Sequence, residues 1–141
     1  MSLNSNGAFH GRHALAEMFN VSSAILDDVD FLSDLIRSAS LAAGATVCDV
    51  IHKKFEPQGV TVLAMLEESH ASFHTYPEFG SLFIDIFTCG EKCDPEKAVD
   101  LIRERLGCAT YSYNLILRSL ARPELSRSPL QEQGSTFSAA G

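Results

Sequence analysis

Hydrophobic and polar positions recur along the chain with the two periods that are typical of strands and helices. Residues 8–18 are strand-like from about Gly11 on, because small apolar residues alternate there with larger or polar ones. Between Asp28 and Ala43 the apolar residues instead recur every three or four positions, as on the buried face of a helix. An aspartate is a favourable N-cap, and Gly44 stands where a left-handed C-cap is expected. We therefore predict a strand followed by a helix.

The middle of the chain holds three further strand-like runs. Two of them, Ala45–Phe55 and Val60–Glu67, are separated by residues 56–59, in which Pro and Gly mark a turn. The third, Ser81–Thr88, is strongly apolar and is expected to be buried on at least one face.

A second helix and a last strand complete the pattern. Asp94 is the predicted N-cap, Pro95 lies in the first turn, and Gly107 ends the helix. Cys108–Leu117 alternates again as a strand. From about Ala121 the composition shifts to Pro, Ser, Gln and Gly, which favours disorder.

The predicted order of elements is β-α-β-β-β-α-β, which indicates an α/β (α+β) fold. Two helices cannot cover both faces of such a sheet, so we expect a two-layer α/β sandwich, an antiparallel sheet with helices on one face. The open face and the strand edges would suit a homodimer. The domain is predicted to span residues 8–119, with disordered tails at 1–7 and 120–141.

Composition narrows the class of protein. The chain has 141 residues, 45% hydrophobic and 21% charged, which fits one globular domain. Its net charge of −7 argues against nucleic acid as a partner. It holds no apolar run long enough for a membrane span and no signal-peptide profile, so we expect a cytoplasmic protein. Four cysteines are too few for a disulfide scaffold and are expected to be free thiols, metal ligands or catalytic groups.

Chemically useful side chains concentrate in residues 67–78, a segment with histidines, serines and carboxylates between two apolar strands. One interpretation is a zinc site of two histidines and two cysteines, although the spacing is loose. The proposed ligands are His70, His74, Cys89 and Cys93. If residues 70–74 are extended, positions 70, 72 and 74 share one face.

Two other interpretations stay open from the residues alone. Ser69 or Cys89 could be a nucleophile activated by a histidine, but the chain lacks a Gly-x-Ser-x-Gly elbow. The same residues could also be satisfied polar groups on a half-exposed strand, with a cysteine that packs as a small hydrophobe.

Several ordered motifs together resemble the prokaryotic S-adenosylmethionine decarboxylase family. The resemblance extends from about Gly11 to Gly107, with the expected spacing between motifs. The motifs are Gly11-Arg12-His13, Lys54-Phe55-Glu56-Pro57-Gln58-Gly59-Val60, Glu68-Ser69-His70, His74-Thr75-Tyr76-Pro77-Glu78, Phe87-Thr88-Cys89-Gly90 and Asp94-Pro95-Glu96-Lys97-Ala98.

The resemblance implies a proenzyme that cleaves its own backbone between Glu68 and Ser69. Ser69 would attack the preceding carbonyl, and elimination from the resulting ester would convert it to a pyruvoyl group that forms a Schiff base with the substrate amine. His74 would remove the α-proton during processing, and Cys89 would protonate the substrate carbon after carbon dioxide leaves. Thr61 stands where the family often has a processing serine. No metal is implied.

The same resemblance implies a nucleoside site. Phe55 and Tyr76 match the aromatic pair that stacks on adenine, with Tyr76 where the family often has Trp, and Glu78 matches the residue that binds the ribose hydroxyls. The product would be the aminopropyl donor for spermidine synthesis. Other departures are Ala71 and Phe73, which replace branched aliphatic residues.

Three rival functions follow from the same residues. The processing machinery would also suit a decarboxylase of arginine or ornithine, although the predicted nucleoside contacts favour S-adenosylmethionine. An unprocessed, non-catalytic binding or regulatory homologue is the second rival, and intact Ser69, His74 and Cys89 argue against it. A metal-binding protein is the third. One geometric difficulty remains, because Ser69 and His74 face opposite sides of an ideal strand, so a turn or bulge is needed near the cleavage point.

Overall fold

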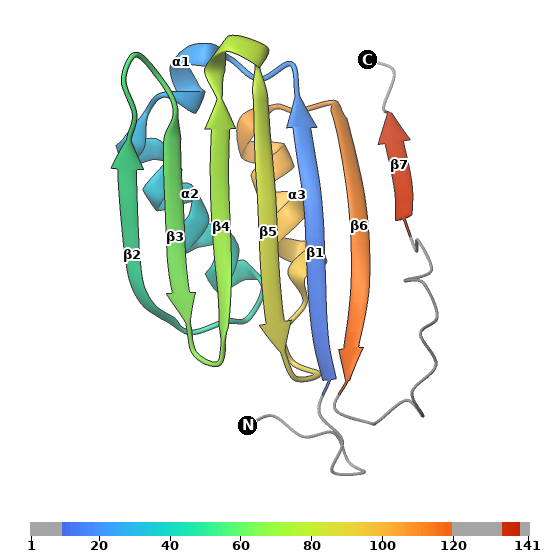
Figure 1. Ribbon diagram of the computed structural model, residues 1–141. Coiled ribbons are helices and arrows are strands. Elements are labelled where there is room, and N and C mark those ends of the chain that lie inside the picture. The colour runs from blue at the N-terminus through green and yellow to red at the C-terminus, as the bar shows by residue number, and fades with distance from the viewer. Residues whose placement is uncertain (1–9, 120–133, 139–141) are drawn as a thin grey trace, which may run out of the picture.

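The protein forms one antiparallel sheet of seven strands in the order β2-β3-β4-β5-β1-β6-β7 (Figure 1). The computed structural model describes residues 10–119 and 134–138. In chain order the elements are β1 (His10–Phe19), α1 (Ser23–Leu26), α2 (Val29–Ala42), β2 (Val47–Lys54), β3 (Val60–Leu66), β4 (Ser69–Tyr76), the 3-10 turn η1 (Pro77–Phe79), β5 (Ser81–Cys89), α3 (Pro95–Leu106), β6 (Thr110–Ser119) and β7 (Gly134–Ser138).

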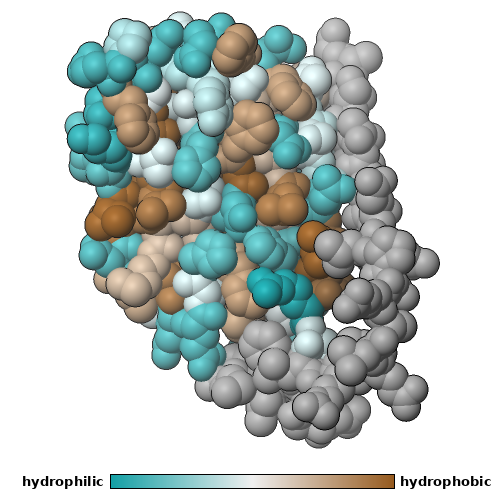
Figure 2. Space-filling view, viewed as in Figure 1, coloured by the Kyte–Doolittle hydropathy of each residue, from teal (hydrophilic) through white to brown (hydrophobic). Residues whose placement is uncertain are grey.

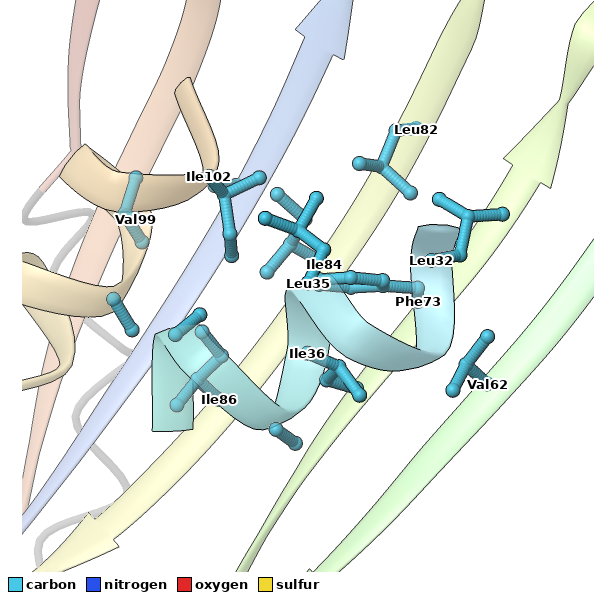
Figure 3. Close-up of a cluster of buried hydrophobic side chains, with 14 of the residues drawn as sticks. Leu32, Leu35, Ile36, Val62, Phe73, Leu82, Ile84, Ile86, Val99 and Ile102 are labelled. Carbon is cyan, nitrogen blue, oxygen red and sulfur yellow. The ribbon is translucent and has the colours of Figure 1, made fainter. Parts of the chain in front are cut away.

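Helices α2 and α3 cover one face of the sheet, as the sequence predicts, and the core lies between the two layers (Figure 1). Leu32, Leu35 and Ile36 of α2 point at the sheet, where they meet Phe73 and Ile84 (Figure 3). Each of these side chains is at most 3% exposed. Burying one such side chain stabilises the fold by about 1.5–3 kcal/mol.

The two long helices begin at the aspartates that the sequence predicts as caps. The Asp28 carboxylate accepts a hydrogen bond from the Phe31 amide at 3.0 Å, and the Asp94 carboxylate accepts one from the Glu96 amide at 3.0 Å. These bonds satisfy amides that the helix itself leaves unpaired. Helix α3 ends at Gly107, whose φ of 61° is left-handed and suits glycine.

Strand β4 is the main difference from the predicted order of elements. Residues 67–78 are predicted to lie between strands, whereas Ser69–Tyr76 forms a strand that pairs with β3 on one side and β5 on the other. Its inward positions are occupied by Ala71, Phe73 and Thr75, which are all buried. The outward positions carry histidine, serine and tyrosine, so buried and polar side chains alternate along the strand. Its mean hydropathy is too low to distinguish it from a loop in the sequence.

The C-terminal segment also differs from the prediction in part. Residues 134–138, predicted as part of a disordered tail, form β7, which pairs with β6. An edge strand leaves a row of backbone amides and carbonyls unpaired, and β7 satisfies that row on β6. The predicted tail at 1–7 and the rest of the C-terminal one lie outside the described residues.

The face of the sheet away from the helices is open and carries large apolar side chains among polar ones (Figure 2). Those on the central and β2-side strands that are more than two-fifths exposed are Ile51, Leu63, Met65, Tyr76 and Phe83. We call this surface the open face. Within residues 10–119 and 134–138, no helix is both long and apolar enough to cross a bilayer.

Candidate active site

The tight turn between β3 and β4 places Ser69 at the first position of β4. Leu66 and Ser69 pair across the hairpin, with Glu67 and Glu68 between them. Glu68 has a φ of 60°, a left-handed backbone that non-glycine residues rarely adopt. Such a residue costs of order 1–3 kcal/mol. The strain therefore lies on the residue that precedes Ser69.

Two hydrogen bonds converge on this turn. The Ser69 hydroxyl donates to the Glu67 carbonyl at 3.1 Å, and the Cys89 thiol donates to the Glu68 carbonyl at 3.1 Å. Cys89 is the last residue of β5 and is 8% exposed. A serine hydroxyl and a thiol thus flank the peptide unit that joins Glu68 to Ser69. We call Glu68, Ser69 and Cys89 the Ser69 end of the sheet.

The Cys89 thiol is held in its protonated form. Burial raises the pKa of the thiol, and the nearby Glu68 carboxylate and the Cys93 sulfur raise the pKa further. At neutral pH the sulfur is therefore a proton donor rather than a thiolate nucleophile. This state suits an acid that delivers a proton to a carbanion.

A groove of about 470 Å³ opens beside Ser69 on the open face. Ser69 and His70 line one side of it, and Ile51, Leu63 and Met65 contribute apolar walls. An apolar groove with a few polar groups at one side is typical of a small-molecule site.

His74 lies at the opposite end of β4. Its Nδ1 atom is 2.9 Å from the Thr61 hydroxyl, and the two residues pair directly across β3 and β4. Tyr76, two positions further on the same face, packs edge-on against Phe83 at 5.4 Å between ring centroids.

The remaining predicted substrate contacts belong to this same end of the sheet. Phe55 follows β2 and donates its amide hydrogen to the Gly59 carbonyl at 2.8 Å, while Glu78 lies in η1 after β4. The loop that carries Phe55 is tied by Asp27, which binds the Lys54 ammonium at 2.7 Å and the Gly59 amide at 2.9 Å. These two bonds hold the pKa of the Asp27 carboxyl below its usual value.

We call Phe55, Thr61, His74, Tyr76 and Glu78 the His74 end of the sheet. The turn predicted near the cleavage point is present between β3 and β4. It does not bring the His74 end of the sheet close to Ser69.

The predicted catalytic residues are therefore divided between the two ends of the sheet. Ser69 and His74 are five positions apart on β4, about 16 Å at the rise of an extended strand. In Figure 1 the β3–β4 turn and the end of β5 lie at the bottom of the sheet, and the β2–β3 turn and η1 lie at the top. The side chains of Ser69 and His74 in a single chain cannot span that separation to act on one carbonyl.

A second cluster of polar groups lies on the open face near Ser69. The Nε2 atoms of His13 and His70 are 2.6 Å and 3.1 Å from the same Asp85 oxygen, Oδ1. The three ligand atoms lie within 4.8 Å of one another, and two histidines with a carboxylate are a set that zinc accepts. The four predicted ligands, His70, His74, Cys89 and Cys93, form no such group in the described part of the chain.

Sequence reasoning did not assign a role to His13 or Asp85. A usable signal was present for Asp85, because it is the one charged residue in the apolar run Ser81–Thr88. An acid in the middle of a central strand needs a partner, and here two imidazoles from the neighbouring strands supply it.

A protein of known structure shares this fold. The solved structure of an adenosylmethionine decarboxylase from Aquifex aeolicus vf5 superposes with a TM-score of 0.65 and 27% identity, covering 86% of this chain and 97% of that one. The fold shared with this decarboxylase is an antiparallel sheet with helices on one face.

The sequence comparisons identify the family. A family model described as S-adenosylmethionine decarboxylase matches residues 12–119. The S-adenosylmethionine decarboxylase proenzyme of Synechococcus sp. (strain WH7803) is 43% identical over 121 residues, 84% of this chain and 94% of that protein. The proenzyme of Prochlorococcus marinus (strain MIT 9313) is 45% identical over 102 residues, 72% of this chain and 82% of that protein. The chain belongs to the S-adenosylmethionine decarboxylase family.

Proposed function

We propose that this chain is a self-cleaving proenzyme whose mature form decarboxylates S-adenosylmethionine with a pyruvoyl group made from Ser69. The product is the aminopropyl donor for spermidine synthesis. Membership in the family and relatives that are named proenzymes support this function. The observation that carries it is the Glu68–Ser69 peptide, which is strained at Glu68 and hydrogen-bonded to the Cys89 thiol.

The cleavage is an acyl shift followed by an elimination. The Ser69 hydroxyl adds to the Glu68 carbonyl carbon, and the peptide C–N bond breaks to leave an ester and a free Ser69 amine. Removal of the Ser69 α-proton then breaks the bond between Cβ of Ser69 and the ester oxygen. The leaving group is the main-chain carboxylate of Glu68. The resulting enamine tautomerises to an imine, and water hydrolyses it with loss of ammonia. Every atom of the pyruvoyl group comes from Ser69 and that water.

The local geometry favours the first step. A thiol that donates to the Glu68 carbonyl withdraws electron density from the carbon to be attacked, and it can hold the oxyanion that forms. Breaking the chain after Glu68 also releases that residue from its left-handed backbone.

In the mature enzyme a pyruvoyl group at residue 69 would supply the carbonyl for the substrate amine and the electron sink for loss of carbon dioxide. The buried, protonated Cys89 thiol then delivers a proton to the substrate carbon. Phe55 and Tyr76 stack on adenine, and Glu78 accepts hydrogen bonds from the ribose hydroxyls. This chemistry uses no metal ion.

The protein acts as a homodimer in this proposal. Its Ser69 end and its His74 end are too far apart to form one site, and the open face exposes large apolar side chains. A twofold axis that lies parallel to the sheet and perpendicular to its strands packs the two open faces together and reverses the ends of the partner. The Ser69 end of one protomer then meets the His74 end of the other.

The two fragments remain one folded unit after cleavage. Strand β3 belongs to the first fragment and β4 to the second, and they pair along six positions from Thr61↔His74 to Leu66↔Ser69. Separating them would expose the core that the two fragments share.

The substrate is tested by a carbon dioxide release assay on the purified protein. Carboxyl-labelled S-adenosylmethionine, arginine and ornithine are compared side by side at equal concentration. We expect release from the nucleoside alone, because the two amino acids lack a purine and a ribose for the His74 end to bind. Faster release from arginine or ornithine would show that the substrate assignment is wrong. The pyruvoyl mechanism would still stand.

Replacing Cys89 with serine should lower kcat at least about 100-fold, the usual worth of a general acid. Some cleavage should persist, since the serine hydroxyl can still donate to the Glu68 carbonyl. A raised thiol pKa keeps the acid form present to higher pH, so the alkaline limb of wild-type kcat should lie above the ordinary thiol value of about 8.5. The variant should lose that limb. Cys108→Ser changes the other buried cysteine of the described residues, so it is the matched control and should keep both kcat and the limb. Normal turnover by Cys89→Ser would exclude the proton-donor role.

A further inference from the structure

The cluster of His13, Asp85 and His70 spans three neighbouring strands of the open face. The Asp85 carboxylate on β5 accepts hydrogen bonds through a single oxygen from His13 on β1 and His70 on β4. The His13 bond is the shorter, at 2.6 Å, and its side chain is the more buried, at 18% exposed against 50% for His70. Asp85 is therefore anchored firmly on the β1 side and reaches from there to β4.

The surroundings of this carboxylate complete the cluster. The Phe87 ring, two positions along β5, lies 5.5 Å from the His13 ring and 6.0 Å from the His70 ring. The Arg118 guanidinium of β6 lies over the Phe87 ring, 4.8 Å from its centroid. Phe87 thus fills the space beside both imidazoles and limits the positions that their side chains can take.

His70 is the first residue after Ser69, and this gives the cluster a position in the proposed reaction. While the chain is intact, the covalent β3–β4 turn holds Ser69 against Leu66. After cleavage the turn is gone, and residue 69 becomes a chain end. Chain ends fray unless something ties them down. The His70 imidazole provides such a tie, because it is bound to the neighbouring strand immediately next to the new end.

We infer that Asp85, anchored by His13, is a positioning residue that holds His70 and so keeps the pyruvoyl end of the mature chain in place. This inference rests on the proposed self-cleavage. Asp85 acts through His70 and does not touch the reacting atoms. Its contribution should therefore be small before cleavage and large after it.

The direct test is hydrogen exchange of the backbone amides in residues 70–73, measured by mass spectrometry. In the cleaved protein, Asp85→Ala removes the acceptor of both imidazoles and should speed exchange there roughly tenfold, as local opening becomes easier. In the uncleavable Ser69→Ala background the same change should leave exchange unaltered, because the covalent turn still holds the strand. Asp85→Asn keeps an acceptor oxygen and should fall between wild type and Asp85→Ala.

A matched control is available on the same face. Glu17 of β1 is also a carboxylate on the open face that accepts a hydrogen bond, here from the Ser112 hydroxyl of β6, and it lies far from Ser69. Glu17→Ala should leave exchange at residues 70–73 unchanged in both backgrounds. Circular dichroism and melting of all variants identify any that fail to fold. His13→Ala then serves as the second variant, with a smaller effect of the same sign.

Steady-state kinetics give an independent measurement. A displaced pyruvoyl end should lower kcat about 10- to 100-fold in Asp85→Ala with little change in KM, since a misplaced group costs rate rather than binding. Equal loosening in cleaved and uncleaved protein would make Asp85 merely structural and overturn the inference. So would stoichiometric zinc in the wild type that is lost in Asp85→Ala, because the cluster would then be a metal site. If the wild type does not cleave at all, the proposed function fails first, and the intact mass reveals it.

Discussion

Replacing Ser69 with alanine is expected to leave the chain in one piece and without decarboxylase activity. No other hydroxyl can take its place, because the attack needs an oxygen on the residue that directly follows the scissile carbonyl. Cys89 cannot substitute for it, since burial keeps the thiol protonated and its hydrogen bond already points at the Glu68 carbonyl oxygen. The loss should be complete rather than partial, because the same residue supplies both the nucleophile and the pyruvoyl group.

The measurement is the intact mass under denaturing conditions, with carbon dioxide release on the same sample. Ser72→Ala is the matched control for cleavage, since Ser72 lies on the same strand only three positions further on. That variant should still yield two fragments. Cleavage of the Ser69→Ala chain at the same peptide bond would exclude the acyl-shift mechanism.

Co-expressing two inactive variants should restore cleavage if the site is shared between protomers. Ser69→Ala destroys the Ser69 end and His74→Ala destroys the His74 end, so each homodimer lacks one half of both of its sites. A mixed dimer contains one site in which both halves are intact. In that site the Ser69 end of the His74→Ala chain meets the intact His74 of its partner.

The expected result is specific to one of the two chains. With random pairing about half of the His74→Ala chains lie in mixed dimers and should be cut, while every Ser69→Ala chain stays whole. Co-expression with two different affinity tags allows the chains to fold together and be distinguished by mass. Separately purified variants, mixed without refolding, are the control. If neither chain is cut in isolated mixed dimers, the site must form within one protomer and the shared-site model is wrong.

The elements that the sequence predicts best are those with strong local signals. Both long helices begin at an aspartate cap and follow an apolar stripe, so their positions depend on neighbours within a few residues. The two-layer arrangement follows from counting two such helices against a larger sheet. These expectations are confirmed.

Strand β4 was harder to predict because its outward face is polar. Ala71, Phe73 and Thr75 alternate with histidines and serine, as in a half-buried strand. The polar residues, however, are more typical of a functional loop than of a central strand. A functional strand in the centre of a sheet therefore resembles a functional loop when only composition is considered.

The arrangement of the site depends on contacts that are distant in sequence. Nothing between Ser69 and His74 indicates that they belong to opposite ends of one sheet, since that depends on β4 being continuous. The Cys89–Glu68 bond and the Asp85 cluster likewise depend on which strands become neighbours. Motif resemblance names such residues one at a time, and only the strand order determines which of them meet.

Self-cleavage at Ser69 to give a pyruvoyl enzyme is tested by the intact mass of the purified wild-type protein under denaturing conditions. We predict two chains, residues 1–68 and 69–141, with the second lighter than its unmodified sequence by one ammonia. Its amino terminus should be blocked to sequencing. A single full-length chain, or a second fragment that begins with an unmodified Ser69, would show that the protein does not make a pyruvoyl group at this position.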